Sequence, residues 1–241
     1  MNSRKSGGSV IKRTDINTYH PITKNQGAAF DAWAKGQNLI LSGSPGTGKT
    51  FLAMYFALQE VFEKQNEYDK IVLVRSIVPT REIGFLPGDE KEKQQAYAKP
   101  YLSLATEITG RDSAWNMMVS SKSIQFESTS FIRGVTFDDA IIVVDEMQNL
   151  NFHELDSVIT RVGERCRMIF CGDYHQSDFQ KQSEKNGILD FLEIIDHMRD
   201  FTIVRFGWED IVRSNFVRDY IMTKEMIQEK KNEKSSNRRG S

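Results

Sequence analysis

The chain has 241 residues, of which 39% are hydrophobic and 10% aromatic, so it can bury the core of one large domain or two small ones. Its apolar runs fall short of 18 residues and its first nine residues are polar, so we expect neither a membrane span nor a secretion signal. These features favour one domain with short appendages and no membrane contact.

The net charge of −1 conceals an uneven distribution. Residues 1–24 hold five Lys or Arg against one Asp, and residues 223–241 hold six against three Glu, which leaves residues 25–222 at −8. Basic ends of this kind are typical of solvated, disordered tails, and contact with nucleic acid is the alternative. The expected organisation is a disordered basic tail over residues 1–17, a folded domain over 18–229 and a second disordered basic tail over 230–241.

The two cysteines, Cys166 and Cys171, flank a short apolar run, with His153 and His175 nearby in the sequence. A zinc site needs more closely spaced pairs, and a disulfide framework needs more cysteines. We therefore expect both cysteines to be reduced and structural.

Short, β-branched apolar runs alternate with longer segments of helical periodicity. Strands are expected over residues 38–42, 71–75, 123–127, 140–145, 167–172 and 201–206. Helices are expected over residues 23–35, 51–62 and 89–109, from a cap at Asn151 to Gly163, and after Ser214. Continuous apolar strands separated by helices predict a mainly parallel sheet covered on both faces, which is a three-layer αβα fold.

The segment after the first expected strand is Gly43-Ser44-Pro45-Gly46-Thr47-Gly48-Lys49-Thr50, and it has the G-x-x-x-x-G-K-T spacing of a P-loop. Between a strand and a helix, such a loop surrounds a phosphate with backbone N–H groups and the positive end of the helix. Lys49 is expected to reach the β- and γ-phosphates, and the Thr50 hydroxyl to hold Mg²⁺. The alternative, a plain glycine-rich turn, leaves this spacing unexplained.

A second candidate site lies where the fourth expected strand ends in Asp145-Glu146. After an apolar strand this pair is a Walker B pattern, in which Asp145 holds the Mg²⁺ shell and Glu146 takes a proton from an attacking water. Two acids at a strand end are a weak signal alone. Downstream of a P-loop they indicate phosphoryl transfer to water.

Two glutamines complete the candidate site. Gln176 follows the fifth expected strand, where its amide would orient water or contact the γ-phosphate, and a polar turn is the alternative. Gln26 opens the helix before the first strand, where its amide would contact an adenine edge.

In this order, Gln26, the P-loop, the acid pair and Gln176 resemble the first RecA-like domain of superfamily 1 helicases. Further segments resemble the PhoH-like ATPase family, in particular its short single-domain members carried by large phages. These segments are residues 71–76, Gly84-Phe85-Leu86-Pro87-Gly88-Asp89, Phe131-Ile132-Arg133-Gly134, Asp145-Glu146-Met147-Gln148-Asn149 and residues 204–213. The resemblance covers about residues 20–222.

The chain also departs from the family pattern. Val135 stands where many members have Arg, Ser76 stands where many cellular members have Pro, and Phe179-Gln180 replaces Leu-Pro. The first departure weakens any phosphate or nucleic-acid contact at position 135, and none touches the nucleotide residues.

The resemblance implies a Mg²⁺-dependent ATPase with a RecA-like sheet, in which Lys49, Glu146 and Gln176 are catalytic and ATP becomes ADP and phosphate. It also implies coupling to single-stranded RNA or DNA, as in helicase cores. Arg75, Arg81 and Arg133, in or beside loops after strands, are the candidate backbone contacts. The expected location is the cytoplasm, or the host cytoplasm for a phage protein.

A helicase also needs a second RecA-like domain to donate an arginine finger, and we expect none in this chain. One hypothesis is a homo-oligomeric ring, such as a hexamer, in which Arg161, Arg205 or Arg213 completes the neighbouring site. A second is a nucleotide-dependent switch that acts through a protein partner. A P-loop kinase for small molecules fits less well, because Glu146 and Gln176 indicate water as the acceptor.

Overall fold

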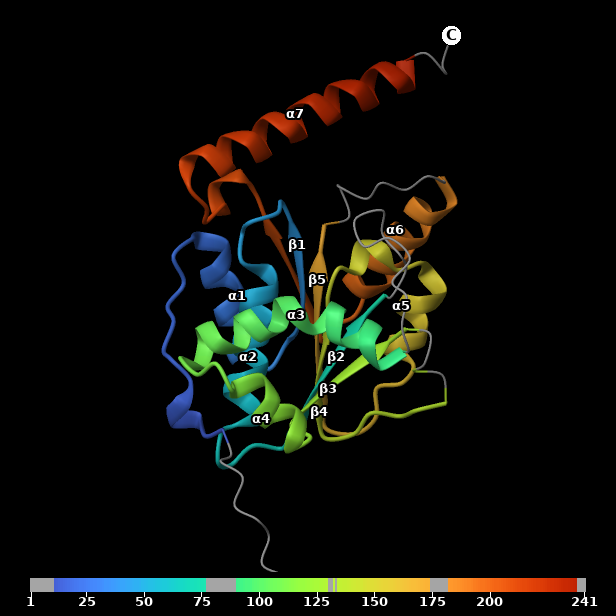
Figure 1. Cartoon of the computed structure of the whole chain (residues 1–241). Coiled ribbons are helices and arrows are strands. Elements are labelled where there is room, and N and C mark those ends of the chain that lie inside the picture. The colour runs from blue at the N-terminus through green and yellow to red at the C-terminus, as the bar shows by residue number, and fades with distance from the viewer. Residues whose placement is uncertain (1–10, 77–89, 130–131, 133, 174–181, 238–241) are drawn as a thin grey trace, which may run out of the picture.

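The computed structural model describes residues 11–76, 90–129, 132, 134–173 and 182–237, and a single parallel sheet organises them (Figure 1). Its six strands lie in the order β3-β2-β4-β5-β1-β6, and every described neighbouring pair is parallel. The strands are β1 (Asn38–Gly43), β2 (Lys70–Arg75), β3 (Ile124–Ser128), β4 (Ala140–Val144), β5 (Cys166–Gly172) and β6 (Phe201–Phe206). The expected three-layer αβα fold is confirmed.

Helices cover both faces of this sheet. They are α1 (Lys24–Ala34), α2 (Lys49–Val61), α3 (Glu90–Thr109), α4 (Ala114–Ser120), α5 (Phe152–Ile159), α6 (Gln182–Asp196) and α7 (Asn215–Asn237). The short 3₁₀ turn η1 (Arg13–Asp15) precedes α1, whereas η3 (Met147–Asn149) lies between β4 and α5 and η4 (Trp208–Asp210) between β6 and α7. Among the residues that the structure describes, no helix is both long enough and apolar enough to cross a bilayer.

The strands alternate their side chains between two cores. Leu39, Leu41 and Cys171 face the core shared with α1 to α4, whereas Ile40 and Phe170 face the core shared with α5 and α6. This alternation follows from the two-residue period of a strand, and burial on both faces explains why the strands are continuously apolar. Cys171 is a buried free thiol and Cys166 a half-buried one, as expected.

The caps of two helices match the sequence. The Thr23 hydroxyl accepts a hydrogen bond from the Gln26 backbone N–H, and Asn151 forms a capping box with Glu154. Helix α5 nevertheless ends at Ile159, well before the expected stop at Gly163. The chain leaves the helix after Thr160 because Val162 forms an isolated parallel β-bridge with Phe137.

Both expected tail boundaries need correction within the described residues. Ile11 and Ile16 are buried in the first core, and Asp15 pairs with Arg111 at 2.5 Å, so residues 11–17 belong to the folded domain. At the other end, α7 continues through Asn237, well past the expected boundary at residue 230. Lys, Glu and Gln are good helix formers, so a solvated helix extends where composition alone indicated disorder.

Candidate nucleotide site

The P-loop joins β1 to α2 at the carboxyl edge of the sheet. Gly43, Gly46 and Gly48 all have positive φ, at 135°, 77° and 87°, a region that other residues rarely adopt. A Cβ on Gly43 would lie 1.9 Å from the backbone oxygen of Phe206 at the end of β6. The glycines therefore allow the loop to curl and to press against the neighbouring strand.

Lys49, the first residue of α2, folds back into this loop. Its Nζ donates to the backbone oxygens of Gly43 and Ser44, at 2.7 Å each, and lies 3.4 Å from Thr47 Oγ1. Burial lowers the pKa of Lys49, and the charge of Asp173 opposes that shift. The lysine is thus half-buried at the loop, and its ammonium stands at the point where a P-loop holds phosphate.

The two predicted metal ligands are in direct contact. Thr50 Oγ1 donates to Asp145 Oδ1 at 2.9 Å, although the two residues lie 95 positions apart in the sequence. Asp145 follows β4, and its backbone N–H donates to Val74 of β2 at 3.0 Å. The parallel sheet brings the two ends together, because every strand ends at the same edge.

The oxygen donors of this pair fit Mg²⁺. Mg²⁺ is usually held by one or two carboxylates together with substrate phosphates, rather than by an all-protein cage. Within the described part of the chain, no group of three or more His, Cys, Asp and Glu side chains is placed to hold a metal. A hydroxyl and one carboxylate beside a phosphate loop therefore suit a magnesium ion that arrives with a nucleotide.

Glu146 lies next to this pair in a left-handed conformation, with φ of 53°. Burial raises the pKa of its carboxyl group, and the neighbouring charge of Asp145 raises it further. Arg75, a hydrogen bond from Gln148 and the charge of Lys49 act in the opposite direction. A carboxylate with a raised pKa, next to the two candidate metal ligands Thr50 and Asp145, suits a general base.

Gln148 holds Glu146 and was not predicted as a site residue. Its Nε2 donates to Glu146 Oε2, and its Oε1 accepts from the Asp173 backbone N–H at 3.0 Å. A Cβ on Gly172 would lie 2.3 Å from Gln148 Oε1, so this approach requires the glycine at the end of β5. The amide thereby ties the candidate base to the end of the adjacent strand.

Gln26 contacts the outer side of the P-loop. Its Nε2 donates to the Thr47 backbone oxygen at 3.2 Å, and its Oε1 accepts from the Ile22 backbone N–H at 3.0 Å. One N–H and one lone pair of the amide remain for a ligand. Contact with adenine therefore stays a prediction, whereas the contact with the P-loop is part of the structure.

The contact of Arg75 with nucleic acid stays a prediction, and its positive charge lies near Tyr101 and the carboxylates of Asp145 and Glu146. Burial lowers the pKa of its guanidinium, whereas Tyr101, Asp145 and Glu146 raise it, with a net upward shift. Its Cζ also lies 5.9 Å from the ring centre of Tyr97. Arg75 is thus an internal cation of the site. Arg81, Arg133 and Gln176 lie outside the described residues.

The segment that follows β6 packs on the P-loop of the same chain. The Val212 backbone N–H donates to the Gly46 oxygen at 3.0 Å, and a Cβ on Gly46 would lie 2.9 Å from Arg213 Cγ. Helix α7 then crosses the carboxyl edge of the sheet (Figure 1). There the Ser44 hydroxyl donates to Glu225 Oε2 at 3.0 Å.

Removal of the Glu225 carboxylate is expected to tighten nucleotide binding. In the structure this negative charge contacts the P-loop hydroxyl of Ser44 and the Trp208 indole, close to where phosphates are expected to bind. We expect Glu225→Ala to increase ATP affinity roughly threefold to tenfold, the order of one partly screened charge. Isothermal titration calorimetry measures this change. Asp219→Asn, on the exposed side of α7, is the matched control, and equal affinities in all three proteins would contradict the prediction.

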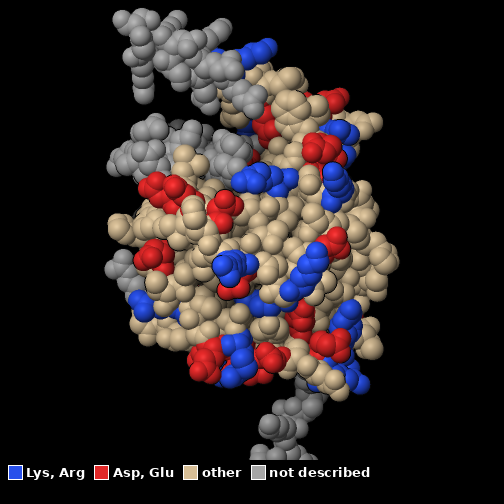
Figure 2. All heavy atoms as spheres, turned by 180° about the vertical axis from the view of Figure 1, so that it is seen from behind, with Lys and Arg blue, Asp and Glu red and all other residues tan. Residues whose placement is uncertain are grey.

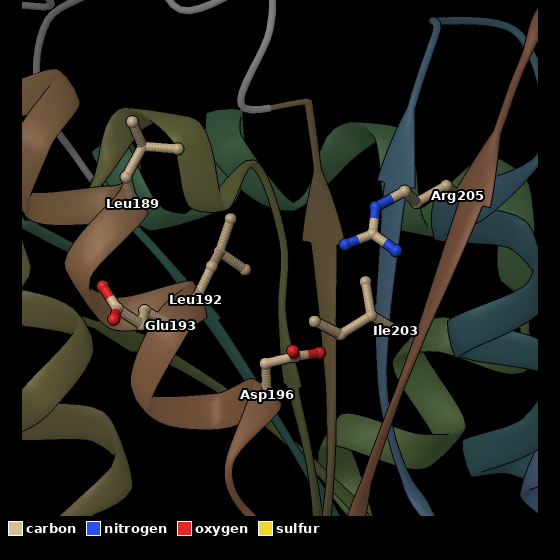
Figure 3. A pocket seen from close by; sticks show the side chains of 6 residues that line it. All are labelled: Leu189, Leu192, Glu193, Asp196, Ile203 and Arg205. Atoms are coloured by element: carbon tan, nitrogen blue, oxygen red, sulfur yellow. The ribbon is translucent and has the colours of Figure 1, made fainter.

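The other two candidate finger residues, Arg205 and Arg161, occupy different parts of the fold. Arg205 projects from β6 over a cavity of about 190 Å³ beside α6, together with Leu192, Ile203 and Asp196 (Figure 3). Arg161 follows α5 near the amino end of β4, where its backbone oxygen accepts from the Phe137 N–H at 2.8 Å. Arg213 lies against the P-loop, whereas Arg205 is paired with Ser42 directly before that loop and directs its side chain to the cavity.

Charges of both signs share the surface. In the view of Figure 2, Lys and Arg alternate with Asp and Glu across the described part of that face. An interspersed pattern like this differs from the basic stripe expected of a nucleic-acid footprint. The described part of this face therefore carries no basic stripe.

Tyr101, Gln148 and Glu225 all contact the site and were missed by sequence reasoning. Gln148 carries a local signal, because it stands two residues after Glu146. No local sequence signal marks Tyr101 or Glu225, because each lies in a helix whose sequence shows no motif.

An all-parallel αβα sheet with a P-loop after β1 and an acid pair after β4 defines a P-loop NTPase fold. The chain belongs to the PhoH-like family, because the family model described as PhoH-like protein matches residues 18–225. The resemblance seen in the sequence is thereby confirmed.

Curated relatives agree with this assignment. The PhoH-like protein of Bacillus subtilis (strain 168) is 33% identical over 190 residues, covering 78% of this chain and 58% of the relative. Protein PhoH of Escherichia coli (strain K12) is 31% identical, covering 74% and 50% respectively. The PhoH-like protein of Mycobacterium leprae is 31% identical, covering 85% and 58%. The chain thus spans about half the length of these relatives.

Solved structures show more distant likeness. The large terminase of a thermophilic bacteriophage, in complex with ADP, matches with a TM-score of 0.49 and 14% identity, covering 83% of this chain and 49% of the terminase. The helicase MrfA bound to DNA matches with a TM-score of 0.47 and 12% identity, covering 84% and 28%.

Proposed function

We propose that this chain binds ATP at the P-loop and, with Mg²⁺, hydrolyses it to ADP and phosphate. The contact of Thr50 with Asp145, at 2.9 Å, carries the proposal. It joins the phosphate loop to the acid pair, so that phosphate, metal and water would meet at one point.

Each part of the proposed site has a distinct role. Lys49 and the loop N–H groups would bind the phosphates, and Thr50 with Asp145 would hold Mg²⁺, which when bound neutralises negative charge on phosphate oxygens. Glu146 would take the proton of the attacking water as the bond from the γ-phosphorus to its leaving oxygen breaks. Gln148 would keep the Glu146 carboxylate in place, through the contact described above. Gln176 is proposed to contact the γ-phosphate, and Gln26 the adenine.

The proposal includes coupling to single-stranded RNA or DNA in a cytoplasmic homo-oligomer. The motif order that resembles helicase cores supports the coupling, with Arg75, Arg81 and Arg133 as the candidate contacts. The alternative is a nucleotide-dependent switch that acts through a protein partner. It is favoured by α7, which already connects the P-loop to an exposed apolar surface that includes Phe216, 82% exposed, and Tyr220, 64% exposed.

One assay separates these proposals. Phosphate release is measured with Mg²⁺ or EDTA, with and without single-stranded RNA and DNA, over a wide range of protein concentration. Stimulation by nucleic acid would support coupling, and turnover per subunit that rises with concentration would support a shared site. Slow turnover that responds to neither would favour the switch. Nucleotide hydrolysis unaffected by EDTA would contradict the proposed use of Mg²⁺.

Arg213 and Arg205 are expected to behave differently in mixtures. A cation that stabilises charge on the transferred phosphoryl group is worth about 10³- to 10⁵-fold in rate. Because Arg213 contacts its own P-loop, we expect Arg213→Ala to lower turnover steeply, and Lys49→Ala protein not to rescue it. Rescue of Arg205→Ala by the same partner would identify Arg205 as the residue donated between subunits. Rescue of Arg213→Ala would contradict its assignment to its own site.

A further inference from the structure

Tyr101 in α3 contacts the Asp145 carboxylate from the side opposite Thr50. Its ring is fully buried, and its hydroxyl donates to Asp145 Oδ2 at 2.7 Å. The other carboxylate oxygen, Oδ1, accepts from Thr50 Oγ1 at 2.9 Å. Both oxygens of the candidate metal ligand are therefore held, one from the helix that follows the P-loop and one from a helix elsewhere in the chain.

The Tyr101 hydroxyl is the donor of its hydrogen bond to Asp145. Arg75 lies near the same hydroxyl, and its guanidinium can only donate, so it leaves the phenolic proton to Asp145. The phenolic proton is then free to point to Asp145, which as a carboxylate can only accept.

The arrangement has a consequence for the Thr50 hydroxyl. If Thr50 turns its oxygen to a metal ion, as the proposed function requires, its donation to Asp145 is weakened or lost. Tyr101 is then the described side chain that still donates to Asp145. A ligand whose carboxylate is already oriented loses less conformational freedom when it binds a metal, and hydrogen bonds to metal ligands commonly change affinity 10- to 100-fold.

We propose that Tyr101 is a positioning residue, which orients the Asp145 carboxylate for Mg²⁺ and so sets the affinity of the nucleotide complex for the metal. This inference rests on the proposed function, since it concerns the metal that accompanies the nucleotide. It assigns Tyr101 no contact with nucleotide or water. The expected effect is on metal affinity, with little effect on nucleotide binding in the absence of metal.

Tyr101→Phe tests the inference, because it removes the hydroxyl and keeps the buried ring. Mn²⁺ binding to the full chain saturated with ADP is followed by electron paramagnetic resonance, which needs no turnover. We expect the Mn²⁺ dissociation constant to rise about tenfold, within the range known for such outer hydrogen bonds. ADP affinity in EDTA should match wild type, and turnover at saturating Mg²⁺ should fall less than about threefold, since chemistry is left to other groups.

Tyr55→Phe is the matched control. Tyr55 is also buried, and its hydroxyl bonds to Tyr19 and Gln59 instead of Asp145, so its removal should leave Mn²⁺ affinity unchanged. Unchanged Mn²⁺ affinity in Tyr101→Phe would overturn the inference, as would loss of ADP binding in EDTA, which would make the hydroxyl a structural requirement. A wild-type protein that binds ADP but no Mn²⁺ would overturn the proposed metal site itself, whatever the variant does.

Discussion

Lys49→Ala is expected to weaken ATP binding and abolish turnover while keeping the fold. The lysine donates to the Gly43 and Ser44 oxygens, and Ser44 keeps a second donor in Thr47, so the loop retains part of its hydrogen bonding. Loss of a charged contact to phosphate should weaken ATP binding roughly 10- to 100-fold, the range of 1.5 to 3 kcal/mol for such bonds. Turnover should fall to background. Fluorescent nucleotide binding and phosphate release measure the two effects.

The fold of this variant is checked by its thermal unfolding midpoint. Lys64→Ala removes a lysine that lies on the surface beyond α2, and it should leave binding and turnover at the wild-type level. Wild-type turnover in Lys49→Ala would end the assignment of the phosphate site to this loop.

Glu146→Gln should separate binding from chemistry. The substitution keeps the shape of the side chain but removes its ability to accept a proton, so we expect turnover to fall by about 10² to 10⁴, the usual contribution of a positioned base. ATP and Mg²⁺ should remain bound, because Thr50 and Asp145 are untouched. Binding and turnover are measured on the same preparation.

A second carboxylate serves as the control for this effect. Burial also raises the pKa of Glu127, which lies in β3 at the far edge of the sheet from β1. Glu127→Gln should therefore leave turnover near wild type. If Glu146→Gln instead loses ATP binding and hydrolysis to the same extent, Glu146 is a metal ligand rather than the base.

The strands could be predicted from the sequence to within about one residue at each end. Continuous β-branched runs such as the one ending at Asp145 are buried on both faces, which makes the pattern independent of the partner strand. The meeting of Thr50 with Asp145 was also foreseeable, since parallel strands end at one edge. The P-loop, the acid pair and the sheet edge at which they meet could therefore be predicted from short segments of the sequence.

The remaining contacts depend on tertiary packing. Tyr101 lies 44 residues before Asp145 on a helix, and nothing in its own neighbourhood shows which residue its hydroxyl meets. The burial of Ile11 was missed because two isoleucines in a basic segment give too little apolar content to outweigh its polar composition. The position of Arg75 beside Tyr97 and the site carboxylates was also not foreseen, because the sequence does not show which way a side chain at a strand end turns.

The central claim is that this site hydrolyses ATP, and a single-turnover experiment tests it most directly. Excess protein is mixed with labelled ATP in EDTA, Mg²⁺ is added in excess, and the ratio of ADP to ATP is followed over time with and without single-stranded RNA or DNA. The account predicts conversion of the bound ATP to ADP only after Mg²⁺ is added, at a rate reduced about 10²- to 10⁴-fold in Glu146→Gln. ATP that stays bound and intact in wild-type protein under every condition would contradict it.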